Sequence, residues 1–135
     1  FTHMQVIRPK TTLMSSNSSS WPQHMLNMAK GDVLVIFDIR RYEQDMAVLA
    51  RVAKENGLEI ILFTDQWASP VAKFARHTFR VHIEVPSAWD SSIVTLFVVE
   101  ALIEAVQSKS WDKTRERISV LEGLFEQSRL FRKPG

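Results

Sequence analysis

Cysteine is absent from this 135-residue sequence, which excludes disulfides and thiolate chemistry. The charges nearly balance, and a formal net charge of +2 is too small to argue for nucleic-acid binding by electrostatics. The longest apolar stretch, 93–106, is interrupted by Glu100 and Glu104 and is too short to cross a bilayer. No secretion signal is present. We therefore expect a soluble cytoplasmic protein that has no membrane partner.

The common catalytic and cofactor motifs are also missing. The sequence holds no G-x-G-x-x-G, P-loop, H-E-x-x-H or G-x-S-x-G pattern. No two of the four histidines are three or four residues apart, so no helical metal pair exists, and His77 and His82 fit surface or packing roles. Glu100 and Glu104 share a helix face, which fits a solvated edge better than an acid/base pair. We expect neither a metal nor a cofactor.

The composition is that of an ordinary globular domain. Hydrophobic residues make up 45% and charged residues 24% of the chain, and the length fits a single domain over 1–135. Within it we expect the tail of a first helix over 1–7, an α/β core over 11–106, and a C-terminal helix over 110–130. The first residue is Phe1 rather than methionine, so we interpret the chain as a fragment of something longer.

One stretch, 31–45, organises the rest. Val33–Phe37 is a short apolar run rich in β-branched residues, which predicts a strand buried on both faces in a parallel sheet. The polar segment 38–43 comes next, and then a helix that ends at Asn56-Gly57, a typical glycine stop. In an open α/β sheet, a loop placed after a strand in this way lines the ligand crevice.

Further strands are predicted over 11–14, 58–63 and 78–83, with helices over about 20–30, 70–76, 93–106 and 111–130. Alternation of strands and helices predicts an α/β fold, a three-layer αβα sandwich around a parallel sheet. Ser69-Pro70 should begin the helix at 70. The helix over 93–106 is apolar almost all round, more than one sheet face can cover, so we expect a homodimer.

These segments resemble a known family. The sequence Gly31-Asp-Val-Leu-Val-Ile-Phe-Asp-Ile-Arg-Arg-Tyr42, then Ile60-Ile-Leu-Phe-Thr-Asp65 and Ser69-Pro-Val-Ala72, is similar to the sugar isomerase (SIS) domain. More narrowly, it resembles the effector domain of RpiR/MurR-type bacterial transcription regulators. The resemblance implies a flavodoxin-like topology, a phosphosugar effector, and DNA binding only through a helix-turn-helix domain that this sequence does not contain. It also implies a central first strand and glycine-containing turn, which this sequence lacks.

The loop after the first buried strand departs from the family pattern. SIS domains usually carry Ser-x-Ser-Gly-x-Thr there, which holds the ligand's phosphate. Here Asp38 and Arg40 replace the serines, Arg41 replaces the glycine, and Glu43 replaces the threonine. Arginine can bind a phosphate or carboxylate with two hydrogen bonds, so an anionic ligand remains a hypothesis. The alternative is a purely structural loop, in which Arg40 and Arg41 pair with Asp38 and Glu43.

We expect three loops, 15–20, 38–43 and 64–69, to converge at the carboxyl ends of the strands. The serine-rich loop is either a hydroxyl-rich edge of this site or a solvated linker. The candidate ligand-binding residues are Ser15, Ser16, Asp38, Arg40, Arg41, Tyr42, Glu43, Thr64 and Asp65.

The preferred function is an effector-sensing, dimerising SIS domain of a transcription regulator that binds a sugar phosphate or sugar acid. One alternative is a phosphosugar isomerase, for which Glu43 is the one candidate base in the central loop. The other is a dimerisation scaffold without a ligand.

Overall fold

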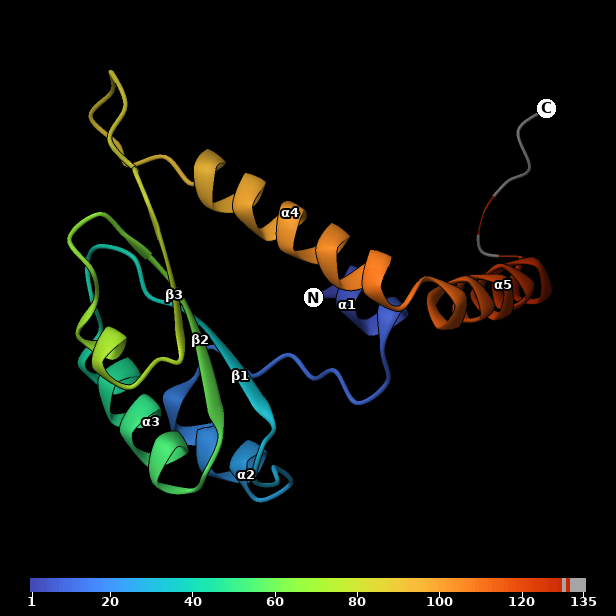
Figure 1. Ribbon diagram of the computed structural model, residues 1–135, viewed down its shortest axis with the longest axis horizontal. Helices are drawn as coiled ribbons and strands as arrows, with labels where there is room; N and C mark the ends of the chain where they lie inside the picture. The colour runs from blue at the N-terminus through green and yellow to red at the C-terminus, as the bar shows by residue number, and fades with distance from the viewer. Residues whose placement is uncertain (130, 132–135) are drawn as a thin grey trace. The chain divides into compact units, whose positions relative to one another are not determined.

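A computed structural model describes residues 1–129 and 131 (Figure 1). The chain divides into two compact units, which we describe separately. Residues 14–98 form the sheet unit, and residues 1–13 with those from 99 onward form the helical unit. Helix α4, Ile93–Lys109, contributes residues to each of them.

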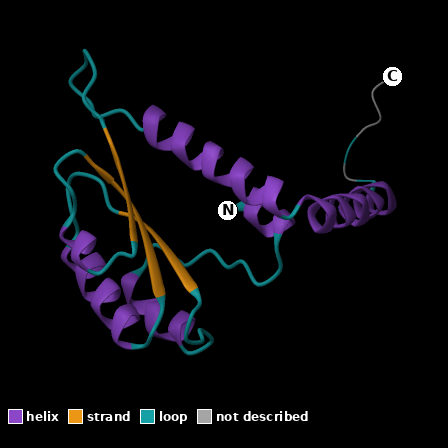
Figure 2. Cartoon of the chain, in the orientation of Figure 1, coloured by secondary structure: helices purple, strands orange, loops and turns teal. Residues whose placement is uncertain are grey.

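The sheet unit contains three parallel strands in the order β1-β2-β3 (Figure 2). They are β1, Val33–Phe37, β2, Glu59–Asp65, and β3, His77–Val81. Phe37 pairs with Phe63 and Phe63 pairs with Phe79, and the three rings stack with centroids 4.8 and 4.9 Å apart. The predicted α/β class with a parallel sheet is therefore confirmed.

One face of the sheet carries the core. Helix α2, Trp21–Met25, helix α3, Gln44–Glu55, and the 3₁₀ helix η2, Pro70–Lys73, supply its cover. The α3 residues Leu49, Ala50 and Ala53 are at most 6% exposed, because their spacing places them on one helix face. The core cluster also includes Trp21, Leu34, Ile36, Leu58, Ile60, Leu62 and Val71.

The other face of β1 is open. Val33, Val35 and Phe37 are 47%, 44% and 49% exposed, whereas Leu34 and Ile36 between them are buried. The prediction that this strand is buried on both faces is therefore wrong. The helices of the core cluster cover the face that Leu34 and Ile36 share, and successive side chains of a strand point to opposite faces.

The strand predicted over 11–14 is also wrong. These residues form no ladder, and the Thr11 hydroxyl instead donates to the carbonyl oxygens of Met4 and Arg8, both at 3.3 Å. The helix predicted over 20–30 is a 3₁₀ turn η1, Ser18–Ser20, succeeded by α2, which ends at Met25. Beyond it, the Asp32 carboxylate accepts a 2.9 Å bond from the Ala29 amide, which favours a turn over further helix. The helix over 70–76 is the shorter η2.

Two boundary signals are confirmed. Gly57 lies in the turn between the end of α3 and the start of β2. Its φ of +78° falls in the left-handed region that favours glycine. Ser69 precedes η2, and its hydroxyl accepts a 3.0 Å hydrogen bond from the Val71 amide. Gly57 therefore sets where β2 can begin, and Ser69 sets where the chain turns into η2 after β2 has ended.

The helical unit contains α1, Thr2–Ile7, part of α4, and α5, Trp111–Ser128. Arg117 of α5 donates to the carbonyl oxygens of Val6 at 2.6 Å and Gln5 at 2.9 Å, near the carboxyl end of α1. A cation at this end of a helix is favourable because the carbonyl groups there have no partner within the helix. Helix α5 continues through Gly123, and Leu130, the last predicted position, lies outside the described residues.

No helix among the residues that the structure describes is long and apolar enough to cross a membrane.

Candidate functional site

The first two strands end side by side, and each delivers a buried carboxylate. Asp38 comes directly after β1 and is 3% exposed, and Asp65 ends β2 and is fully buried. The Asp38 amide donates a 3.0 Å hydrogen bond to the carbonyl of Phe63, which extends the pairing of the two strands into the loop. Buried carboxylates are stable only where donors surround them, so their partners define what each one does.

Asp38 is held by the turn after β2. The Ser69 hydroxyl donates to the Asp38 carboxylate and also accepts from Val71, while the Ser69 amide donates to the Thr64 hydroxyl at 2.9 Å. Thr64 and Ser69 are both buried. Asp38 and Thr64, two of the predicted ligand residues, therefore stabilise the loops through these contacts.

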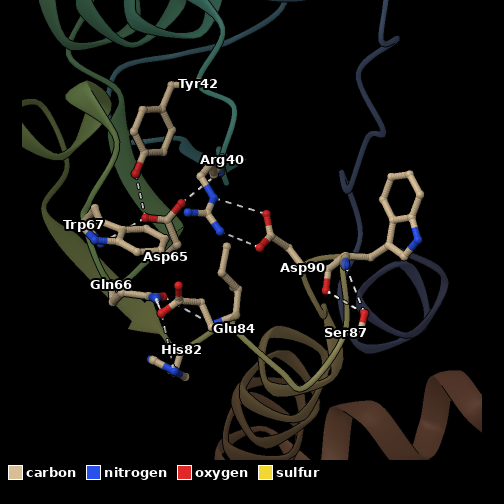
Figure 3. A network of polar contacts seen from close by, with 11 residues as sticks. Arg40, Tyr42, Asp65, Gln66, Trp67, His82, Glu84, Ser87 and Asp90 are labelled. Carbon is tan, nitrogen blue, oxygen red and sulfur yellow. Dashed lines mark hydrogen bonds and ion pairs between the residues drawn. The ribbon is translucent and has the colours of Figure 1, made fainter.

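Asp65 ties the two loops together (Figure 3). One carboxylate oxygen accepts from the Arg40 amide at 2.8 Å, and the other accepts from the Tyr42 hydroxyl at 2.6 Å and the Trp67 amide at 3.0 Å. Burial alone would raise the pKa of Asp65, but these bonds and one from the Ala68 amide hold it below its usual value. Desolvation, together with the bond to Asp65, raises the pKa of Tyr42 to about 12.

The Arg40 side chain contacts the segment that connects β3 to α4. Its guanidinium donates to both oxygens of Asp90, from Nη2 at 2.6 Å and from Nε at 3.2 Å. It also lies 4.2 Å from the ring centroid of Trp67, within range of a cation–π contact. The hydrogen bond to Asp90 raises the pKa of Arg40 and lowers that of Asp90. The alternative in which Arg40 pairs with Asp38 or Glu43 is therefore wrong, because the Arg40 guanidinium instead binds the carboxylate of Asp90.

The segment that carries Asp90 connects β3 to α4. Gln66 anchors its start, accepting from the Ile83 amide at 3.2 Å and donating to Glu84 at 3.1 Å. The Ser91 amide donates to the Ile83 carbonyl at 2.8 Å, which closes the segment into a loop. We call residues 84–90 the Asp90 loop. The sequence offered no signal that it would meet Arg40, which is 50 residues away in the chain.

The other predicted residues lie at the margin of this network. Arg41 and Glu43 are exposed, and Glu43 is the residue just before α3. Ser15 accepts from the Asn17 amide at 3.1 Å through its hydroxyl and from Trp21 at 2.9 Å through its carbonyl. Among the described residues, neither Ser15 nor Ser16 hydrogen-bonds to the Asp65 network. The third loop at this edge is thus the Asp90 loop.

A separate groove of about 570 Å³ lies between α2 and α3. Its lining is largely apolar and contains no residue of the Asp65 network. The groove is therefore distinct from the candidate anion site at Arg40. Part of its lining is Met25, Leu26, Val48, Leu49 and Val52, with Ser18 and Ser19 at its edge. Within the described part of the chain, no three His, Asp or Glu residues gather as a metal site would require.

Comparison with known proteins agrees with this architecture. Residues 1–105 match the SIS domain family. Among solved structures, the chain is similar to the sugar isomerase domain of an RpiR transcription factor from Sphaerobacter thermophilus, with a TM-score of 0.81 and 18% sequence identity. The match covers 90% of this chain and 68% of that one, and at this identity it shows a common fold. No curated protein matches. Because the family match spans most of the sequence, the chain belongs to the SIS domain family.

Proposed function

We propose that this SIS domain senses an effector for a transcription regulator, and that the effector is a phosphosugar or a related anionic carbohydrate derivative. The likeness to the RpiR transcription factor domain supports the regulatory role. In such a protein a helix-turn-helix domain would contact DNA, and the SIS domain would report the effector and hold a dimer.

One observation carries the ligand proposal: a half-exposed arginine is positioned at the carboxyl ends of the strands. The Arg40 amide is fixed by Asp65, and its side chain, which is 40% exposed in its pair with Asp90, lies over Trp67. Arginine binds phosphate or carboxylate groups bidentately, through two N–H groups. Open parallel α/β sheets bind ligands beyond the carboxyl ends of their strands, where Arg40 lies. Arg41 adds an exposed cation from the same loop.

The geometry favours binding without turnover. An isomerase needs a base that can take a proton beside the substrate's carbonyl group. Asp38 and Asp65 are buried and accept hydrogen bonds, and the pKa of Asp65 is lowered, which makes it a weaker base. Glu43 is exposed at the start of α3 and has no side-chain cap bond. We therefore place the isomerase second.

The test is a thermal-shift screen of sugar phosphates and sugar acids against this protein. A ligand that binds only the folded state raises Tm, so we expect at least one of these anions to do so while their neutral parent sugars do not. The best ligand is then incubated with the protein and recovered unchanged, as judged by NMR. Conversion to an isomer would favour the enzyme, and a panel without any shift would favour the scaffold.

A further inference from the structure

Arg40 already has an anionic partner within the chain. The two carboxylate oxygens of Asp90 accept hydrogen bonds from Nη2 and Nε of the guanidinium (Figure 3). An effector's phosphate or carboxylate would bind the guanidinium in the same bidentate way. One guanidinium face lies over Trp67. An external anion that binds the same two N–H donors therefore has to displace Asp90.

Apart from the ion pair with Arg40, the Asp90 loop is held at its start by Gln66 and by short-range hydrogen bonds of its own. Its ends are joined by the bond between the Ser91 amide and the Ile83 carbonyl, and its tip is ordered by the Ser87 hydroxyl, which accepts from the Trp89 amide at 2.9 Å. Neither contact involves Arg40. Breaking the ion pair with Asp90 therefore removes the contact that holds this part of the loop against Arg40, so the short-range bond at the tip opens more often.

The ion pair is also weak enough to be displaced. The side chains of Arg40 and Asp90 are 40% and 37% exposed, and exposed pairs contribute little because water and salt screen them. A ligand that adds contacts with Arg41 or with backbone amides would outcompete a carboxylate that has only Arg40.

We propose that Asp90 is an internal competitor for the effector's anionic group, and that effector binding releases the Asp90 loop. This inference rests on the proposed function, because it assigns the ligand to Arg40. Asp90 lies shortly before Ile93, the first residue of α4, so a change in the loop would occur next to the start of that helix. Asp90 would then lower the affinity of the Arg40 site for anions that make few other contacts. It would also link binding of the effector at Arg40 to release of the Asp90 loop.

The test compares wild type with Asp90→Asn in calorimetric titrations with two probes, inorganic phosphate and glucose 6-phosphate. Loss of the competing pair should tighten binding about two- to fivefold, the range that exposed ion pairs allow. Glu84→Gln is the matched control, since it removes a carboxylate from the same loop that bonds to Gln66 rather than Arg40. It should tighten binding less. Hydrogen exchange over 84–90 should rise when either probe saturates wild type.

Equal affinities of wild type and Asp90→Asn, or equal gains in Asp90→Asn and Glu84→Gln, would overturn the competition while leaving the anion site intact. So would unchanged exchange over 84–90 in saturated wild type. Absence of binding to any of the three proteins would overturn the anion site itself, and this inference with it.

Discussion

The Tyr42 hydroxyl donates a 2.6 Å hydrogen bond to the Asp65 carboxylate, and this bond joins the loop after β1 to the end of β2. The same carboxylate fixes the Arg40 amide, so one buried residue positions both the tyrosine and the arginine of the candidate site. The loop is therefore organised before any ligand arrives, which reduces the entropy that binding must overcome.

Tyr42 is the single tyrosine, so its phenol can be titrated by ultraviolet absorbance without overlap. Desolvation and the bond to Asp65 favour the neutral phenol, so we expect a midpoint of about 12 in the folded protein. In Asp65→Asn the midpoint should fall toward the usual 10.0. Circular dichroism at each pH shows whether the chain is still folded. A wild-type midpoint near 10.0 in folded protein would contradict the contact.

The raised pKa also predicts how stability depends on pH. The folded chain holds the phenolic proton more tightly than the unfolded chain, so this contribution is complete below pH 10 and disappears as pH rises through 12. The contribution of Asp65 to stability depends on pH in the opposite direction. Its pKa is lowered, so its contribution is present above pH 3.8 and is lost as pH falls further. Urea unfolding of wild type and Asp65→Asn should therefore differ most near neutral pH and converge in strong acid.

Ser69→Ala should destabilise the sheet unit. The substitution removes the hydroxyl that donates to buried Asp38 and accepts from the Val71 amide. Hydrogen bonds to a charged group contribute about 1.5–3 kcal/mol, and we expect a loss of that size in the free energy of unfolding by urea. Ser87→Ala, whose hydroxyl bonds within the exposed Asp90 loop, is the control and should cost at most about 0.5 kcal/mol. Equal losses would mean that the Asp38 contact contributes nothing specific.

Glycine substitutions should have opposite signs at two positions. Gly57 has φ of +78°, and a Cβ there would come 2.9 Å from Cγ of Lys30, so Gly57→Ala should cost roughly 1–2 kcal/mol. Gly123 lies inside α5 with open space around it, so Gly123→Ala should stabilise by about 0.5–1 kcal/mol. Thermal unfolding of both variants provides the comparison. A stabilised Gly57→Ala would show that this turn adopts another conformation.

The proposed dimer can be tested on α4. Ile93, Leu96 and Phe97 are 69%, 57% and 70% exposed, an apolar surface of the kind that marks interfaces. We expect light scattering to report a dimer for wild type and a monomer for Leu96→Glu with Phe97→Glu. Leu26→Glu, at an exposed position beyond α2, should leave the dimer intact. A wild-type monomer at high concentration would count against the assembly.

Much of the fold could be predicted from local patterns. Apolar runs identified β1 and β2, and alternation of apolar with polar residues identified β3. Asn56-Gly57 and Ser69-Pro70 marked element boundaries, and the parallel order could be inferred from strand–helix alternation. The strand predicted over 11–14 was wrong because strand propensity does not indicate whether a neighbouring strand is available for pairing. The Thr11 hydroxyl instead donates to carbonyl oxygens at the end of α1.

The site was only partly predictable for a related reason. Asp38, Arg40, Tyr42 and Asp65 lie at or just after the ends of strands that the sequence identifies, so their neighbourhood could be inferred from topology. Their partners could not, because a carboxylate's choice among donors depends on side-chain geometry. In the sequence Asp90 merely precedes the helix predicted over 93–106, and only the path of its loop brings it to Arg40.

The central claim is that the loop after β1 binds an anionic carbohydrate effector through its arginines. The most direct measurement is calorimetric titration of the ligand found in the screen into wild type and into Arg40→Ala with Arg41→Ala. Loss of charge-assisted contacts should weaken binding about ten- to a hundredfold or abolish it. Arg51→Ala with Arg76→Ala removes the same charge from exposed ion pairs elsewhere and should bind normally. Binding by the Arg40/Arg41 double variant as tight as that of wild type would show that this loop is structural and that sensing occurs elsewhere.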